Sequence, residues 1–132
     1  MADRASKSTK LIKVSRKSAQ EVKEALVERL APVKEFVLTL NSDNGKEFSK
    51  HQEVSEGLKA EFYFAKPYHS CERGLNEHTN GLVREYFPKS LRFGEISEEA
   101  VVKVEILLNN RPRKVLNFAT PIEAFSQFRE AA

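Results

Sequence analysis

The chain has 132 residues, of which 40% are hydrophobic and 31% charged, and its formal net charge is +3. This length suffices for one domain with a hydrophobic core but not for two, and the balance is that of an ordinary globular protein. The small positive charge does not identify a nucleic-acid-binding protein by itself.

Cysteine usage and hydropathy exclude several further classes. Cys71 is the only cysteine, which excludes an internal disulfide and a zinc site built from several thiolates. No apolar run approaches the ~20 residues that a membrane-spanning helix needs. The N-terminal sequence MADRASKSTK also lacks the apolar stretch of a signal peptide. We therefore expect no membrane partner and a protein of the reducing cytoplasm.

The first third of the chain predicts a strand followed by a helix. Residues 1–7 are polar, and we expect them to be loose. Residues 8–15 alternate between apolar and polar side chains and predict a strand. Ser18 followed three positions later by Glu21 is a capping box, which predicts a helix that ends before Pro32.

The middle of the chain predicts two more strands with a helix between them. Residues 36–40 (FVLTL) form a nearly continuous apolar run, typical of a strand buried on both faces, and residues 41–45 interrupt it. A helix is expected at about 48–58, and 61–64 (EFYF) predicts a short strand. This alternation predicts an α/β fold with parallel pairing through right-handed crossovers.

Three helices are expected in the remainder. After a loop at 66–74, the pattern predicts one helix at 74–86 and another that begins at Ser97. Residues 109–117 form a basic loop. Thr120, with Pro121 in the first turn and Glu three residues after the cap, predicts a last helix, beyond which we expect 127–132 to be loose.

Two acidic residues are candidates for chemistry, although each has a simpler explanation. Asp43 follows the end of a predicted buried strand, where open α/β sheets bind ligands. Asp-Asn-Gly alone is more often a turn, because Asn-Gly tolerates a left-handed backbone. Glu77 lies in a polar run of a predicted helix, where a solvent-exposed glutamate would be ordinary.

The order of the motifs around Asp43 and Glu77 is more informative than either residue alone. A strand ends in Asp-Asn-Gly-x-x-Phe, a short helix and strand follow, and then come Pro-Tyr and a helix that carries a glutamate. From about residue 1 to 126 the chain resembles the integrase core of DDE transposases, most closely the IS-thirty group of insertion-sequence transposases. The motifs that carry this resemblance are Ser42–Phe48 with His51, Tyr63–Ser70, Glu72–Leu82, Tyr86–Lys89, Asn109–Lys114 and Thr120-Pro121.

The resemblance implies a fold and a reaction. It implies an α/β, ribonuclease-H-like integrase core across residues 1–132, with a mixed sheet flanked by helices. It implies that Asp43 and Glu77, separated by 33 residues, are the second and third metal-binding carboxylates. Such enzymes cleave and join DNA strands with Mg²⁺ or Mn²⁺, and two cations clamp the attacking and leaving oxygens. Carboxylate oxygens are the ligands that these hard cations prefer.

The first carboxylate of the family pattern has no counterpart in this chain. The only earlier aspartate is Asp3, which lies too close to Asp43 and resembles the family's turn between its second and third strands. We therefore expect that the first strand and most of the second are absent. The edge at residues 36–40 would then pair with residues 8–15 or with a second copy of the chain, so we expect a homo-oligomer.

Other polar and aromatic residues are weighed against ordinary structural roles. His51 and His69 lack metal-ligand spacing and are interpreted as loop or cap residues. Tyr63, Phe64 and Phe87 are expected in the core rather than as platforms for bases. Candidate DNA contacts, given that lysine and arginine are also common surface residues, are Arg73, Asn76, Asn80, Arg84, Lys89, Arg111, Arg113 and Lys114.

Three functions remain open from the sequence. The leading hypothesis is a transposase catalytic core that acts on DNA in the bacterial cytoplasm, associated with the nucleoid. The missing aspartate favours a second one, an inactive core fragment that binds DNA or transposase protomers. A ribonuclease-H-type nuclease would share the fold and the metals, but it would not predict the Arg-Gly-x-Asn-Glu and Asn-Arg-Pro-Arg-Lys motifs.

Overall fold

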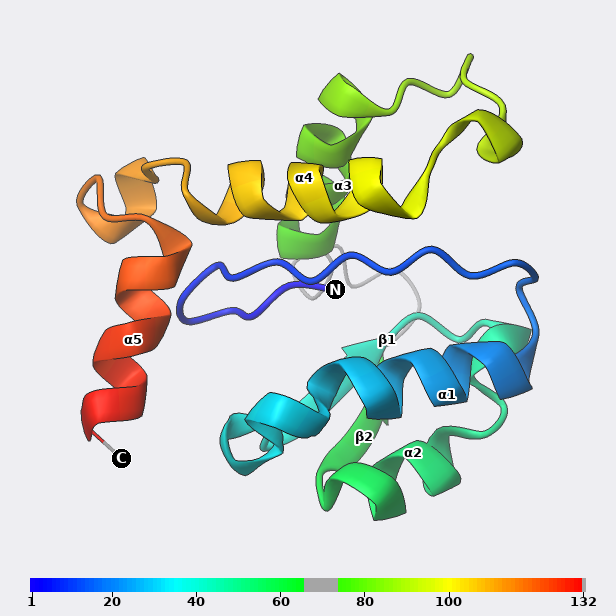
Figure 1. Ribbon diagram of the computed structural model, residues 1–132. Coiled ribbons are helices and arrows are strands. Elements are labelled where there is room, and N and C mark those ends of the chain that lie inside the picture. The colour runs from blue at the N-terminus through cyan, green and yellow to red at the C-terminus, as the bar shows by residue number, and fades with distance from the viewer. Residues whose placement is uncertain (66–73, 132) are drawn as a thin grey trace. The chain divides into compact units, whose positions relative to one another are not determined.

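The computed structural model describes residues 1–65 and 74–131 of the chain (Figure 1). Two compact units make up the fold. We call Val14–Glu72 the central unit, and Met1–Lys13 together with Arg73–Ala132 the terminal unit. Each has its own hydrophobic core.

The central unit is a strand–helix–strand motif covered by a further helix. Its elements are α1 (Ala19–Leu30), β1 (Thr39–Ser42), α2 (His51–Leu58) and β2 (Glu61–Phe64). The two strands pair in parallel, from Thr39 opposite Glu61 to Ser42 opposite Phe64, and α2 is the crossover between them. The parallel pairing predicted from the sequence is therefore confirmed for these strands. Their sheet is wholly parallel, so no mixed sheet is seen among the described residues.

Apolar side chains of both helices hold the central unit together. Leu30 of α1 packs with Val54 and Leu58 of α2 and with Ala60, and Leu58 is 1% exposed. The predicted cap of α1 is confirmed, because the Ser18 hydroxyl accepts a hydrogen bond from the backbone N–H of Glu21. This packing fixes α1 and α2 against the sheet that carries Asp43.

The strand predicted at 36–40 is displaced and less buried than expected. Residues Ala31–Phe36 form a 3₁₀ helix, η1, with proline in its first turn, and β1 begins only at Thr39. Leu38 is 76% exposed. The expectation of burial on both faces was wrong because β2 is the only described strand that pairs with β1.

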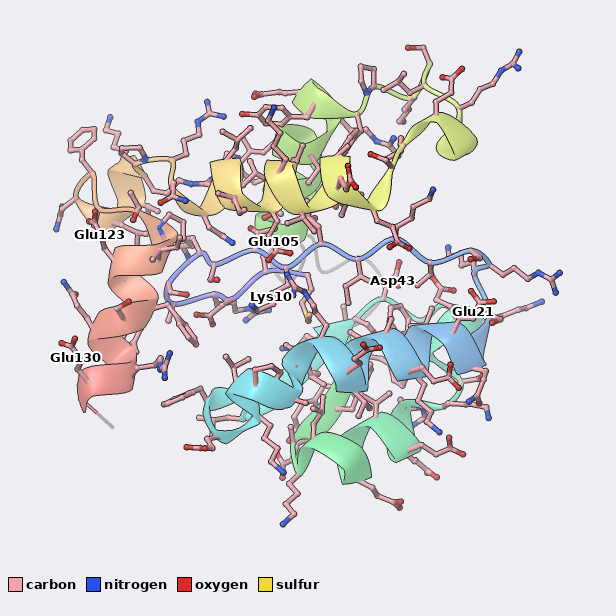
Figure 2. All side chains as sticks on the ribbon, viewed as in Figure 1. Lys10, Glu21, Asp43, Glu105, Glu123 and Glu130 are labelled. Carbon is pink, nitrogen blue, oxygen red and sulfur yellow. The ribbon has the colours of Figure 1, made fainter. Side chains whose placement is uncertain are left out.

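The strand predicted at 8–15 does not form, so its expected pairing with 36–40 does not form either. Only Thr9 makes an isolated antiparallel bridge, with Ala2. Side chains of α4 (Glu98–Asn109) bond the backbone instead: Asn109 accepts from the Thr9 N–H at 2.7 Å and donates to the Thr9 carbonyl at 2.8 Å. Glu105 accepts from the Leu11 N–H at 2.7 Å (Figure 2). A helix thus satisfies backbone groups that the sequence pattern assigned to a neighbouring strand.

Residues 1–7 form local hydrogen bonds, and their expected looseness stays a prediction. The Asp3 carboxylate accepts from the backbone N–H and the hydroxyl of Ser6, at 3.0 and 2.5 Å. Ser6 is fully buried. Short polar side chains that bond their own backbone form turns of this kind.

The described residues of the terminal unit form three α-helices. They are α3 (Gly74–Tyr86), α4 and α5 (Pro121–Ala131), with short 3₁₀ helices η4 (Phe93–Glu95) and η5 (Lys114–Leu116). Leu82, Val104 and Leu108 form the core, against which Leu11 and Phe87 pack. None of the described helices is long and apolar enough to cross a membrane.

The predicted helix starts in this unit are confirmed, but its predicted end is not. Ser97 caps α4 by accepting from the Ala100 N–H at 3.1 Å. Thr120 and Glu123 form a reciprocal capping box at 3.2 and 3.3 Å. Residues 127–131, expected to be loose, belong to α5.

Candidate active site

Asp43 follows β1 directly, at the edge of the sheet where β2 also ends. Its carbonyl accepts hydrogen bonds from the Gly45 N–H at 2.9 Å and from the Ser42 hydroxyl at 3.0 Å. The Asp43 side chain is exposed, and its carboxylate has no hydrogen-bond or ion-pair partner among the described residues (Figure 2). An exposed carboxylate at the carboxyl end of a parallel sheet stands where such sheets bind ligands.

Gly45 does not adopt the left-handed conformation that the Asn-Gly sequence would tolerate. Its backbone is extended, with φ −94° and ψ 149°. A Cβ atom added there would lie 2.4 Å from Oε2 of Glu47 and 2.7 Å from its Cδ. A side chain at this position would therefore displace the Glu47 carboxylate, which folds back over the turn that follows Asp43.

Lys17 pairs with this folded-back carboxylate. Its Nζ lies 2.9 Å from Glu47 Oε1, and the Glu47 side chain is only 14% exposed. A hydrogen bond from its own backbone N–H, and then the bond from Lys17, hold the pKa of Glu47 below its ordinary value. The same pair raises the pKa of Lys17, with a smaller contribution from the charge of Asp43. The charge of Asp43 therefore acts on Lys17, although less strongly than the ion pair with Glu47.

Glu77 lies in the first turn of α3 and is exposed. Asn80 is also exposed and one helical turn further on, so the two residues share a face of the helix. The Asn76 backbone belongs to α3, but its side chain lies outside the described part of the structure. The roles expected for Glu77 and Asn80 at a metal or DNA site stay a prediction.

Asp43 belongs to the central unit and Glu77 to the terminal unit. Their expected approach, within reach of a shared cation, stays a prediction. Across residues 1–65 and 74–131 no three His, Cys, Asp or Glu side chains are grouped in a way that could hold a metal ion.

The predicted DNA contacts that the structure describes all belong to the terminal unit. Arg84 Nη1 donates to the Phe87 carbonyl at 3.3 Å, and Arg111 forms an exposed ion pair with Glu85 of α3 at 3.2 Å. Lys89 is exposed. Arg113 and Lys114 line one hollow with residues of α3. Arg73, together with His69 and Cys71, lies outside the described residues.

Comparison with known proteins gives this geometry a context. No protein-family model matches the chain. The transposase for insertion sequence element IS4351 of Bacteroides fragilis is 48% identical over 125 residues, which are 95% of this chain and 38% of that protein. Transposase InsI for insertion sequence element IS30A of Escherichia coli K12 is 36% identical over 93% of this chain and 32% of that protein. Over most of its length, this chain is homologous to IS30-family transposases. It spans about a third of the length of those relatives.

A solved structure shows the fold. The catalytic core domain of BIV integrase superposes with a TM-score of 0.68, covering 89% of this IS30-family homologue and 77% of that chain at 20% identity. The α/β fold with helices and a short parallel sheet is thus that of a retroviral integrase core, which is ribonuclease-H-like. The resemblance drawn from the sequence motifs is confirmed.

The aromatic residues and His51 that the sequence analysis considered are only partly as expected in this transposase homologue. Phe87 packs against the core of the terminal unit, as predicted. Tyr63 is 50% exposed, so its assignment to the core was wrong, and Phe64 is 36% exposed. Tyr63 and Phe64 are the last two residues of β2, and both are exposed. His51 begins α2, bonds the Phe48 carbonyl through Nδ1 at 3.1 Å, and packs edge-on against Phe64, which accords with the structural interpretation.

Sequence reasoning missed Lys17 and gave Glu47 no role. Glu47 stands in the motif after Asp43, so its proximity could have been suspected. Lys17 lies 30 positions before Glu47 and has no pattern that points to it.

We expect Gly45→Ala to displace the Glu47 carboxylate from the turn, because the new Cβ would occupy its place. The Glu47 pKa should then rise toward its ordinary value. Since the native pKa is lowered, the stability that this group contributes is present above the ordinary glutamate pKa and is lost as the pH falls through the native pKa. Carbon-detected NMR titration of the Glu47 side chain measures the change.

Lys17→Met provides a matched comparison for this prediction. It removes the ion pair but keeps the room above Gly45, so the Glu47 pKa should rise less than in Gly45→Ala. That order follows because the backbone hydrogen bond is the larger cause of the lowered pKa. An unchanged Glu47 pKa in Gly45→Ala would contradict the role assigned to the glycine.

Proposed function

We propose that this chain is part of the catalytic core of a DNA transposase and that Asp43 and Glu77 are two of its metal-binding carboxylates. The observation that carries the proposal is the exposed, unpaired carboxylate of Asp43 at the carboxyl end of the parallel sheet. Its relatives' names support the reaction class, because they are transposases of insertion sequences.

The donor chemistry of the two residues fits Mg²⁺ or Mn²⁺. Both side chains are exposed, and both offer hard oxygen ligands, which leave room for the water molecules that Mg²⁺ retains. A bound cation would polarise a phosphodiester and activate the attacking oxygen. The Asp43 side chain would be ready to bind, because no described residue competes for its oxygens.

DNA is the proposed partner, and the basic residues of the terminal unit are its proposed contacts. Lys89, Arg113 and Lys114 would bind backbone phosphates, which give affinity without sequence preference. Arg111 is already paired with Glu85, so its phosphate contact would have to compete with that carboxylate. The same proposal includes self-association of the chain through the edge of β1 that does not face β2. It also includes action on DNA at the nucleoid, in the bacterial cytoplasm.

A second function is favoured by one observation on Asp3. Its carboxylate is engaged by Ser6 and by the Ala5 N–H, so the only other aspartate in the chain is not available as a metal ligand. This favours a core fragment that binds DNA or transposase protomers without cutting. A ribonuclease-H-type nuclease shares the fold but has no such observation in its favour.

Metal titration tests the leading proposal. We expect the chain to bind Mn²⁺ weakly, measured by water-proton relaxation, and Asp43→Asn or Glu77→Gln to reduce the affinity by about tenfold or more, because each removes a charged ligand. If the two residues share a cation, Asp43→Asn with Glu77→Gln should lose little beyond either single change.

Glu56→Gln is the matched control, because Glu56 is an exposed carboxylate of the central unit outside the site. Its Mn²⁺ affinity should equal that of the unchanged chain. Equal loss in all three variants would mean non-specific binding to surface charge and would overturn the assignment of the two ligands.

A further inference from the structure

A hollow in the terminal unit brings together cations from distant parts of the sequence. Its volume is about 270 Å³. The residues that line it are Lys7, His78, Thr79, Arg113, Lys114 and Val115. Three of the six carry a full positive charge, and none is a carboxylate.

The backbone around the hollow is fixed in an unusual way. Lys7 has a left-handed backbone, with φ 60°, and its ammonium donates to the Arg4 carbonyl. The Arg113 N–H donates to the Ala119 carbonyl at 3.0 Å, and the Arg113 carbonyl accepts from the Phe118 N–H at 2.8 Å. Phe118 is itself left-handed, with φ 66°. Non-glycine residues adopt this conformation only where the surroundings enforce it, and such positions are frequent at binding sites.

The Arg113 guanidinium is incompletely satisfied. Its Nη2 donates to the Leu108 carbonyl at 3.2 Å, while Nε is buried and has no hydrogen-bond acceptor among the described residues. Burial, and then the neighbouring charge of Arg111, lower the pKa of Arg113. Because Nε has almost no accessible surface, an ion in the hollow would act on Arg113 through the charge of the guanidinium rather than by accepting from Nε.

The positive charges around the hollow favour an anionic ligand. Like charges repel, and the repulsion grows where protein walls displace water. Lys114 is exposed and forms no ion pair with the described residues. Of the acids of α3, Glu85 is paired with Arg111, and the exposed Glu77 directly precedes the lining residue His78. An anion would therefore relieve the repulsion among the three cations and supply acceptors for their donors.

We propose that this hollow binds a phosphate group, with Lys7, Arg113 and Lys114 supplying charge and His78 and Thr79 supplying neutral donors. The group is either a backbone phosphate of DNA or a free phosphate ion. Only the first source rests on the proposed function. Lys7, His78 and Thr79 thereby gain a role that the sequence did not indicate.

Two measurements on the full chain test the site. The affinity for a short DNA duplex is measured by fluorescence anisotropy at several salt concentrations, and the response to inorganic phosphate is followed through the Thr79 and Lys114 amide resonances. Each lost phosphate contact should reduce the slope of log affinity against log salt by about 1. We expect this reduction in Lys7→Ala and in Lys114→Ala.

Lys103→Ala is the matched control, because Lys103 is an exposed lysine of α4 that does not line the hollow. It removes the same charge and should leave the slope nearly unchanged. Far-UV circular dichroism verifies that each variant is folded. If Lys7→Ala unfolds the chain, Lys7→Arg, which keeps the charge, should retain the slope while Lys114→Ala loses it.

Each outcome decides the matter. A smaller slope in the hollow variants only identifies DNA as the source. A free phosphate ion is identified if phosphate shifts the amide resonances saturably, Lys114→Ala abolishes these shifts, and the salt dependence of DNA affinity is unchanged. Equal slopes in all variants together with no phosphate shift overturn the proposal. Asp43→Asn should change neither readout, so failure of the metal site and failure of this hollow are separately visible.

Discussion

The purified chain, mixed with Mg²⁺ or Mn²⁺ and a DNA duplex, is expected to leave the DNA uncut and unjoined. Phosphodiester cleavage of this type needs two cations ~3.5–4 Å apart, held by carboxylates on both sides. Asp43 and Glu77 would supply two ligands under the proposed function, whereas the Asp3 carboxylate is bonded to Ser6 within its own turn. The second cation would therefore lack a bridging ligand. Denaturing gel electrophoresis of end-labelled DNA measures both cleavage and joining.

Asp43→Asn is the control that gives this experiment its meaning. Metal-dependent cleavage that persists in Asp43→Asn would indicate a contaminating nuclease. Cleavage that Asp43→Asn abolishes would contradict the prediction and show that another residue of this chain replaces the missing first carboxylate. Asp3→Asn would then show whether Asp3 is that residue.

Asn109→Ala is expected to destabilise the terminal unit by about 2–4 kcal/mol, because it leaves two buried backbone groups of Thr9 without partners, at roughly 1–3 kcal/mol each. Thr9 is 1% exposed and Asn109 is 7% exposed, so water cannot readily replace the amide. Against a typical total of about 5–15 kcal/mol, this loss is large. Urea denaturation measures it, and hydrogen exchange of the Thr9 amide reports it locally.

Asn110→Ala provides the comparison at the neighbouring position. Asn110 has the same side chain, is exposed, and donates only to the Ile106 carbonyl at 2.8 Å. Its loss should change the free energy of unfolding by no more than about 0.5 kcal/mol. Similar losses for the two asparagines would show that the hydrogen bonds to Thr9 do not hold residues 8–11 in place.

Local signals in the sequence predicted the helices well. Ser18, Ser97 and Thr120 each precede a glutamate-bearing first turn, and each begins a helix in the structure. The short strand at 61–64 was also placed correctly. These elements are specified by neighbours within four residues, which is why one sequence reveals them.

The errors arose where partners are distant in the chain. The alternation at 8–15 is that of a strand, but Glu105 and Asn109, about a hundred positions away, bond its backbone. An alternating pattern of apolar and polar residues does not show whether the backbone bonds a neighbouring strand or, as here, side chains of a helix. The same limit applies to the site: Asp43 and Glu77 were found through motifs, whereas Lys17 and the hollow around Arg113 depend on contacts between segments far apart in sequence.

The difference in sequence separation between the two units has a consequence for synthesis on the ribosome. In the central unit, β1 and β2 pair across 22 positions, from Thr39 to Glu61, so this unit can assemble once residue 72 has emerged. Thr9 is made early, but Asn109 follows it by 100 positions. The N-terminal segment must therefore wait, with exposed backbone, until α4 has been translated. Closing so long a loop slows folding more than it costs stability, so the terminal unit is the later and more vulnerable part of the nascent chain.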